Sequence, residues 1–164
     1  MAQAGLELSQ LEPGDLGEIL ALHAEVYILE RGYPAVFELY VLQALAGFMA
    51  NFNAEDDLFL VIRRQRNLVG SVALKRLAAT TAQLRFLILS GCIRGQGAGA
   101  ELFNAARQHA VARGCRELVL ETASDLTAAR AIYEGHGLRR RSNAPAVWLP
   151  DGVMSELWGG PLSR

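Results

Sequence analysis

The feature that most constrains this chain is a glycine-rich loop between a strand-like segment and a helix-like segment. Residues 83–89 have the composition of a strand, and Gly95, Gly97 and Gly99 follow before apolar residues recur at helical spacing. A helix N-terminus presents unpaired backbone N–H groups, and glycines let phosphate oxygens approach them closely. The sequence therefore predicts a strand, an anion-binding loop and a helix in succession.

Two other kinds of phosphate-binding loop have glycine patterns of their own. A Walker loop ends in Gly-Lys-Ser or Gly-Lys-Thr, whereas this loop ends in Gly-Ala-Glu, so that interpretation is excluded. The dinucleotide fingerprint is satisfied by Gly95, Gly97 and Ala100, and Glu121 ends the next strand as a ribose-binding acid would. A dinucleotide-binding protein stays open as an alternative, although the residues after the loop are too few for a doubly wound domain.

Hydrophobic periodicity predicts an α/β fold with one mixed sheet flanked by helices. Ser124 or Asp125 is expected to cap the last helix, and the chain is expected to end in a hairpin that turns at residues 150–152. The expected strands lie near residues 6–8, 58–62, 68–74, 83–89, 117–121, 146–149 and 153–158, and the expected helices near 16–32, 34–51, 99–113 and 125–137.

Charge and hydropathy exclude several classes of function. A net charge of −1 provides no positive field for a nucleic-acid partner. Apolar runs are of strand length, well short of the roughly 20 residues that cross a bilayer, and the first residues lack the charge pattern of a secretory signal. Cys92 and Cys115 have no zinc-site spacing. We expect a single domain over residues 1–164 in the cytoplasm, with no metal and no membrane partner.

Two segments resemble the signatures of the GNAT superfamily of N-acetyltransferases. Residues 84–99 are similar to its central motif, a strand followed by Arg/Gln-x-x-Gly-x-Gly/Ala, which Arg94, Gly97 and Gly99 satisfy. Residues 123–138 resemble the second signature, a helix that ends in Tyr-Glu-x-x-Gly-Phe. The chain also resembles the transferase module of MarR/GNAT-type fusions, without their winged helix-turn-helix regulator. The resemblance implies a mostly antiparallel mixed sheet with a central β-loop-α site for acyl-CoA.

The resemblance also implies where acetyl-CoA, the co-substrate, binds. Its pantetheine arm would pair with the main chain of Leu87, Ile88 and Leu89, inside a V opened between two adjacent strands. One backbone N–H group there would polarise the thioester carbonyl. The pyrophosphate would lie over the loop residues Arg94, Gly95, Gln96, Gly97, Ala98, Gly99 and Ala100.

Two catalytic roles follow from the same resemblance. Tyr133 occupies the position of the tyrosine that protonates the leaving thiolate in many relatives, and core packing is the alternative for this ring. Glu121 matches the general base of some ribosomal-protein acetyltransferases, and a solvated strand-end carboxylate is the alternative. Leu126 stands where many relatives have an asparagine that contacts CoA, so Asp125 or Ser124 is expected to substitute for it.

The acceptor is expected to bind between the first two helices and the last hairpin. Glutamates among aromatic residues suit a cationic amine there, and Tyr27, Glu30 and Tyr33 are the candidates. The expected function is acetyl transfer to a primary amine of a small molecule or peptide, by direct attack in a ternary complex. A non-catalytic CoA-binding module is the main alternative, and the sequence leaves a homodimer open.

Overall fold

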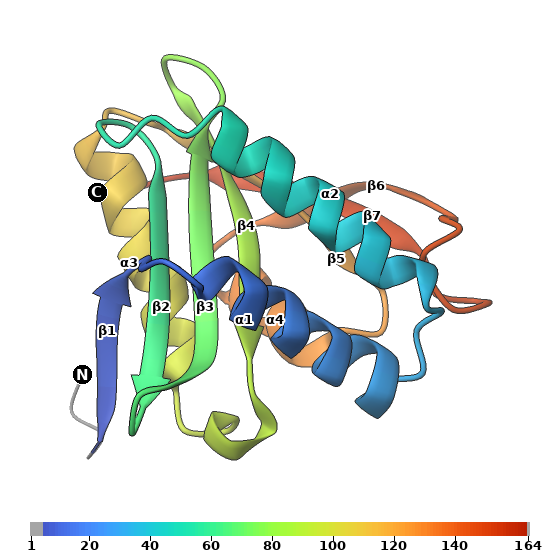
Figure 1. Cartoon of the computed structure of the whole chain (residues 1–164). Helices are drawn as coiled ribbons and strands as arrows, with labels where there is room; N and C mark the ends of the chain where they lie inside the picture. Colours follow the sequence, from blue (N-terminus) through green and yellow to red (C-terminus); the bar gives the residue numbers. More distant parts are fainter. Residues whose placement is uncertain (1–4, 164) are drawn as a thin grey trace.

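The protein forms one sheet with helices on both faces (Figure 1), and the computed structural model describes residues 5–163. The helices are α1 (Asp15–His23), η1 (Ala24–Glu30), α2 (Val36–Ala50), η2 (Gly91–Ile93), α3 (Ala98–Ala112) and α4 (Thr127–Gly135). The strands are β1 (Leu6–Gln10), β2 (Leu58–Arg64), β3 (Asn67–Arg76), β4 (Thr81–Leu89), β5 (Glu117–Ala123), β6 (Arg139–Ala144) and β7 (Ser155–Pro161).

The seven strands lie in the order β1-β2-β3-β4-β5-β7-β6. Within residues 5–163, β4 and β5 are the one parallel pair, and all other neighbouring strands are antiparallel. The expected α/β fold with a mixed, mostly antiparallel sheet is confirmed. A doubly wound dinucleotide domain needs a largely parallel sheet, so that alternative is wrong.

Two hydrophobic cores lie on the two faces of the sheet. Successive side chains of β3 point to opposite faces and so contribute to both cores. Val72 and Leu74 face α3, while Ala73 faces α1 and α2. In Figure 1, α1 and α2 cross the front of the sheet and α3 runs behind it. Helix α1 continues directly into the π-helical turns of η1, so the two form the single helix that the sequence predicts over 16–32.

The C-terminal hairpin differs from the prediction. Residues 146–149 were expected to form a strand, but the partner of β7 is β6, and residues 145–154 connect the two. Every side chain of β6 is exposed, so this strand has no alternation of buried and exposed residues from which it could be recognised. Trp148 and Leu149 instead pack in the hydrophobic core that contains α1 and α2.

The cap of α4 was also predicted wrongly, since the residue before the helix is Leu126 and it makes no side-chain cap. Ser124 Oγ instead accepts a hydrogen bond from the Met154 N–H group at 2.9 Å, which ties the residue after β5 to the residue before β7. Asp125 faces the helices on the other side of the cleft, as described below.

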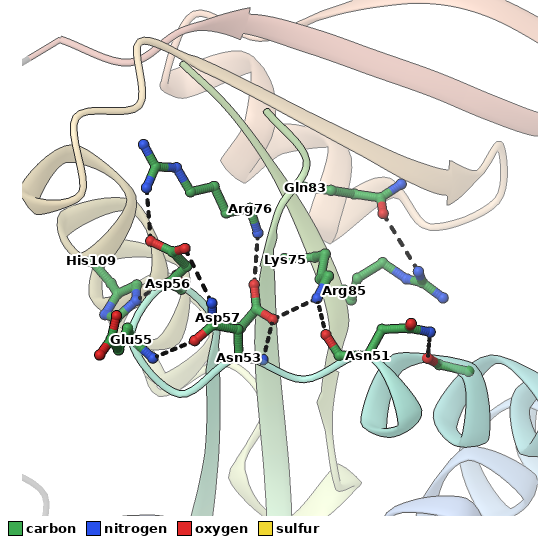
Figure 2. Close-up of polar contacts among 11 residues, drawn as sticks. Asn51, Asn53, Glu55, Asp56, Asp57, Lys75, Arg76, Gln83, Arg85 and His109 are labelled. Atoms are coloured by element: carbon green, nitrogen blue, oxygen red, sulfur yellow. Dashed lines mark hydrogen bonds and ion pairs between the residues drawn. The ribbon is translucent and has the colours of Figure 1, made fainter. Parts of the chain in front are cut away.

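A buried aspartate holds the loop between α2 and β2 (Figure 2). Asp57 is 3% exposed, and its carboxylate accepts hydrogen bonds from Lys75 Nζ at 2.6 Å and from the backbone N–H groups of Asn53 and Arg76 at 2.9 Å each. Burial opposes ionisation, but these donors prevail and lower the pKa of Asp57.

The lowered pKa of Asp57 predicts a pH-dependent share of the stability. Because the folded value lies below the unfolded one, this contribution is present above the unfolded pKa of about 4 and is lost as pH falls through the folded pKa. We expect Asp57→Asn to lower the free energy of unfolding at pH 7 by about 1 to 2 kcal/mol and by less at pH 3. Urea unfolding at both pH values measures this, with exposed Asp151→Asn as the control. Equal losses at the two pH values would contradict it.

Candidate active site

The sheet opens at its centre, where β4 and β5 stop pairing. Their parallel register runs from Thr81↔Glu117 to Leu84↔Leu120 and ends there, although β4 continues to Leu89 and β5 to Ala123. Strand β3 still pairs with β4 at Ile88 and Leu89. Within residues 5–163, the edge of residues 87–89 that faces β5 therefore has no neighbouring strand, which gives the V-shaped opening that the family resemblance implies.

A β-bulge in β4 accompanies the opening. Ala73 pairs with Arg85 and Ser71 with Ile88, so one residue of β3 faces two residues of β4. Phe86 has φ 51°, a left-handed conformation that a bulky side chain adopts only where its surroundings impose it. The buried Ser71 hydroxyl donates to the Phe86 carbonyl at 2.7 Å, and the Phe86 ring stacks on Phe59 at 5.7 Å. These contacts hold the bulge that redirects β4.

A cavity of about 590 Å³ lies in the opening between β4 and β5. It extends from the glycine loop to an aromatic end under α2. Most of the predicted site residues line it: Leu87, Ile88, Leu89, Arg94, Gly95, Gly97, Gly99, Ala100, Glu121, Tyr133, Tyr27 and Tyr33. Three others, Gln96, Ala98 and Glu30, do not line it. The structure thus brings the loop, both catalytic candidates and two acceptor candidates to one cavity.

The three glycines of the loop have different structural roles. Gly95 and Gly97 have φ of 72° and 84°, which only glycine adopts without strain, and open space surrounds the position of a Cβ at either one. A Cβ at Gly99 would lie 3.3 Å from Leu89 Cδ1, so this glycine permits close packing of α3 on β4. The N-terminus of α3 consequently lies at the cavity, where the unpaired backbone N–H groups of a helix can bind a phosphate.

Arg94, the first residue of the glycine loop, contacts η1. Its guanidinium forms an ion pair with Glu30 Oε2 at 2.8 Å and donates from Nε to the Leu89 carbonyl at 3.2 Å. Both side chains of the pair are more than a third exposed. Glu30 thus contacts the loop, and its predicted role at the acceptor stays a prediction.

Tyr133 lies in α4 with its ring packed between Phe103 and Trp158, at centroid distances of 5.8 and 6.2 Å. Burial raises the pKa of its hydroxyl above the ordinary value of 10, and the nearby Tyr27 adds to the shift. No described residue forms a hydrogen bond with this hydroxyl. The phenol is therefore protonated at neutral pH, beside the cavity and available to a ligand.

Glu121 stands on the opposite strand of the opening. Its side chain is exposed to the cavity, and its carboxylate accepts a hydrogen bond from the Tyr40 hydroxyl at 3.0 Å. Burial, followed by the charge and hydrogen bond of Glu121, raises the pKa of Tyr40 to about 12. Tyr40 in turn stacks on Trp148 at 4.1 Å, with the two rings 7° from parallel. Trp148 was missed from the sequence because its segment was assigned to a strand.

Asp125 connects the two sides of the cleft. Its carboxylate accepts a hydrogen bond from the Tyr33 hydroxyl at 2.7 Å and lies 3.5 Å from Arg31. The aromatic rings of Tyr33 and Tyr27 lie 5.2 Å apart on the same wall. Asp125 was expected to substitute for an asparagine that contacts CoA, and that role stays a prediction. In the structure its carboxylate binds two residues of the connection between η1 and α2.

Residues 5–163 contain neither a candidate metal site nor a candidate membrane-spanning helix. No group of three or more histidine, cysteine, aspartate or glutamate side chains in this range is arranged to hold a metal ion. No helix in it combines the length and the apolar character needed to cross a membrane.

Comparisons with known proteins agree with this geometry. Residues 22–138 match the sequence model of the acetyltransferase (GNAT) family. A comparison with curated proteins finds no match.

Solved structures similar to this fold include several acetyltransferases. One from Streptococcus agalactiae is 18% identical with a TM-score of 0.78, over 98% of this chain and 100% of that one. A GNAT acetyltransferase from Staphylococcus aureus is 15% identical with a TM-score of 0.77, over 96% and 99%. The ribosomal-protein-S18-alanine N-acetyltransferase of Escherichia coli is 20% identical with a TM-score of 0.68, over 97% and 95%. At these identities the structural likeness supports the fold.

Proposed function

The chain belongs to the acetyltransferase (GNAT) family, and we propose that it transfers an acetyl group from acetyl-CoA to a primary amine by direct attack in a ternary complex. The observation that carries this proposal is the parting of β4 and β5 directly beside the glycine loop. One cavity there joins an open strand edge, a helix N-terminus, a protonated phenol and a carboxylate. Such a site can hold both substrates and move protons between them.

The binding part of the proposal rests on main-chain groups. The free edge of Leu87, Ile88 and Leu89 would pair with the amide groups of the pantetheine arm, as one strand pairs with another. An N–H group of this edge would also polarise the thioester carbonyl. The start of α3, at residues 98–100, would hold the pyrophosphate, and Arg94 would exchange its bond with Glu30 for the phosphate oxygens.

The chemical part assigns one proton transfer to each catalytic residue. Glu121 takes a proton from the acceptor ammonium, directly or through water, so that the neutral nitrogen can attack the thioester carbon. As the new C–N bond forms and the C–S bond breaks, Tyr133 supplies a proton to the departing sulfur, and the second proton that the nitrogen loses restores the Tyr133 phenol, directly or through water. The products are the acetylated amine and free CoA thiol, and one proton is released to solvent.

Removing the carboxylate of Glu121 is expected to slow the reaction. We predict that Glu121→Gln lowers kcat about tenfold and leaves CoA affinity unchanged, because the amide keeps the shape but cannot take the proton. Steady-state rates over a pH series and calorimetry with CoA measure the two effects. Glu117→Gln is a matched control, since this glutamate lies at the other end of β5 and pairs with Arg141 at 2.9 Å. Parent-like rates in Glu121→Gln would assign the proton transfer to another group.

The proposed activity itself is tested by thiol release from acetyl-CoA in the presence of a panel of primary amines. We expect release that depends on the amine and on enzyme concentration. CoA binding without thiol release would support the non-catalytic module instead.

A further inference from the structure

Arg85 is an unpaired cation in the wall of the cavity. The wall contains three arginines, Arg31, Arg85 and Arg94. Arg31 and Arg94 each form an ion pair, but Arg85 has no carboxylate partner among the residues that the structure describes. Its guanidinium donates to the Gln83 side-chain oxygen at 3.4 Å, drawn as a dashed line in Figure 2, and lies 5.0 Å from the centre of the Phe86 ring. A half-buried guanidinium with a weak amide contact retains most of its capacity for an anion.

Glu121 is the complementary case. It is the one carboxylate in the described wall of the cavity, and its hydrogen bond comes from the neutral hydroxyl of Tyr40. Arg85 and Glu121 directly follow the last paired rung of β4 and β5, so they stand on opposite sides of the opening. They form no ion pair with each other. A positive and a negative group therefore face the same space, each without a partner of opposite charge.

The rest of this end of the cavity is aromatic. Tyr40 of α2 stacks on Trp148 of the β6–β7 loop, and Phe37 lies 6.2 Å from the same indole. This stack joins α2 and the β6–β7 loop at the wall of the cavity. A cavity of about 590 Å³ is of the size that holds a small molecule.

We infer that the acceptor is a small zwitterion of the amino-acid class with an apolar side chain. Its carboxylate binds Arg85, its ammonium group faces Glu121, and its side chain packs against Phe37, Tyr40 and Trp148. This inference rests on the proposed acetyl transfer, because Glu121 must then deprotonate the ammonium group that it binds. A planar guanidinium can bind a carboxylate through two hydrogen bonds, which would fix the distance between the amine and the thioester.

The test compares acceptors that differ only in the carboxylate. L-phenylalanine and L-methionine are each paired with the corresponding decarboxylated amine, phenethylamine or 3-(methylthio)propylamine, and thiol release gives kcat/KM for each. We expect the amino acids to be preferred at least tenfold. Arg85→Gln should raise KM for the amino acids about 10- to 30-fold and leave the decarboxylated amines unchanged, because it removes a charge-assisted contact. Arg85→Lys should recover part of the loss.

Two controls separate this inference from the proposed function. CoA affinity measured by calorimetry should be unchanged in Arg85→Gln, and Arg66→Gln, at an exposed arginine of the β2–β3 turn, should behave as the parent. Equal use of acids and decarboxylated amines, with no effect of Arg85→Gln, would overturn the zwitterion and leave acetyl transfer intact. Preference for a peptide such as Phe-Gly-Gly would overturn it in favour of a polypeptide acceptor. Absence of thiol release with every acceptor would contradict acetyl transfer itself.

Discussion

Replacing Gly97 with valine is expected to weaken CoA binding at least a hundredfold. Gly97 precedes α3 with φ 84°, and no atom lies within 4 Å of the position that a Cβ would occupy. The effect therefore comes from the backbone, because a β-branched residue in this conformation is strained by about 1 to 3 kcal/mol. Relief of the strain would turn the N–H groups of the loop away from the phosphate, and each charge-assisted hydrogen bond contributes about 1.5 to 3 kcal/mol. A hundredfold loss corresponds to about 2.7 kcal/mol.

Calorimetric titration of the folded variant with CoA measures this loss, and the chain provides a matched control. Gly114, after the other end of α3, has φ 82° and equally open surroundings. Gly114→Val should therefore lower the melting temperature as Gly97→Val does while CoA affinity stays that of the parent. Gly97→Asn should recover part of the affinity, since asparagine tolerates the left-handed region. Undiminished affinity in Gly97→Val would remove the assignment of the loop to phosphate.

Local patterns in the sequence were sufficient for most of the fold. The β2–β3 hairpin is an example, because two apolar runs flank a polar turn in which Gln65 and Arg66 take the positive φ of a tight connection. The glycine loop could be recognised in the same way, since the strand, the glycines and the helix follow one another along the chain. Both features depend on neighbouring residues alone.

The opening of the cavity could not be predicted in the same way. The bulge at Phe86 depends on a hydrogen bond from Ser71, which is fifteen residues earlier in the chain and reads as one more position in a buried strand. Asp125 meets Tyr33 across a separation of 92 residues. Such contacts depend on how the sheet and helices meet, which hydrophobic periodicity does not encode.

The residues at the acceptor end of the cavity could not be predicted from local sequence patterns either. Trp148 lies in an irregular connection, where an apolar residue has no periodic context to show what it packs against. Arg85 was assigned to a strand without a role, because its unpaired state becomes apparent only when the pairs of the other cavity arginines are known.

A second tyrosine, which is partly buried, competes with Tyr133 for the role of proton donor. Tyr27 lines the same cavity, and burial raises the pKa of its hydroxyl to about 12. The charge of Tyr27 is also one of the causes that raise the pKa of Tyr133, so the two hydroxyls lie within electrostatic range of each other. Family resemblance favours Tyr133, whereas the burial of both phenols keeps either one protonated at neutral pH. Substitution of each tyrosine separately decides between them.

Tyr133→Phe is expected to lower kcat about a hundredfold while CoA affinity and melting temperature stay close to those of the parent. The phenylalanine ring keeps the packing on Phe103 and Trp158, and the missing hydroxyl has no partner within residues 5–163 whose loss would destabilise the fold. A thiol has an ordinary pKa of about 8.5, so its thiolate is a tolerable leaving group, and the effect should stay well below the upper end of the 10²- to 10⁴-fold range for such catalysis.

Because burial raises the pKa of Tyr133, the donor stays protonated in alkaline assays, and kcat of the parent should show no loss up to about pH 9 from deprotonation of this group. Steady-state rates of Tyr133→Phe and Tyr27→Phe, with thermal unfolding of both, measure these expectations. A hundredfold loss in Tyr27→Phe and parent-like turnover in Tyr133→Phe would transfer the role of acid to Tyr27 and leave Tyr133 as a packing residue.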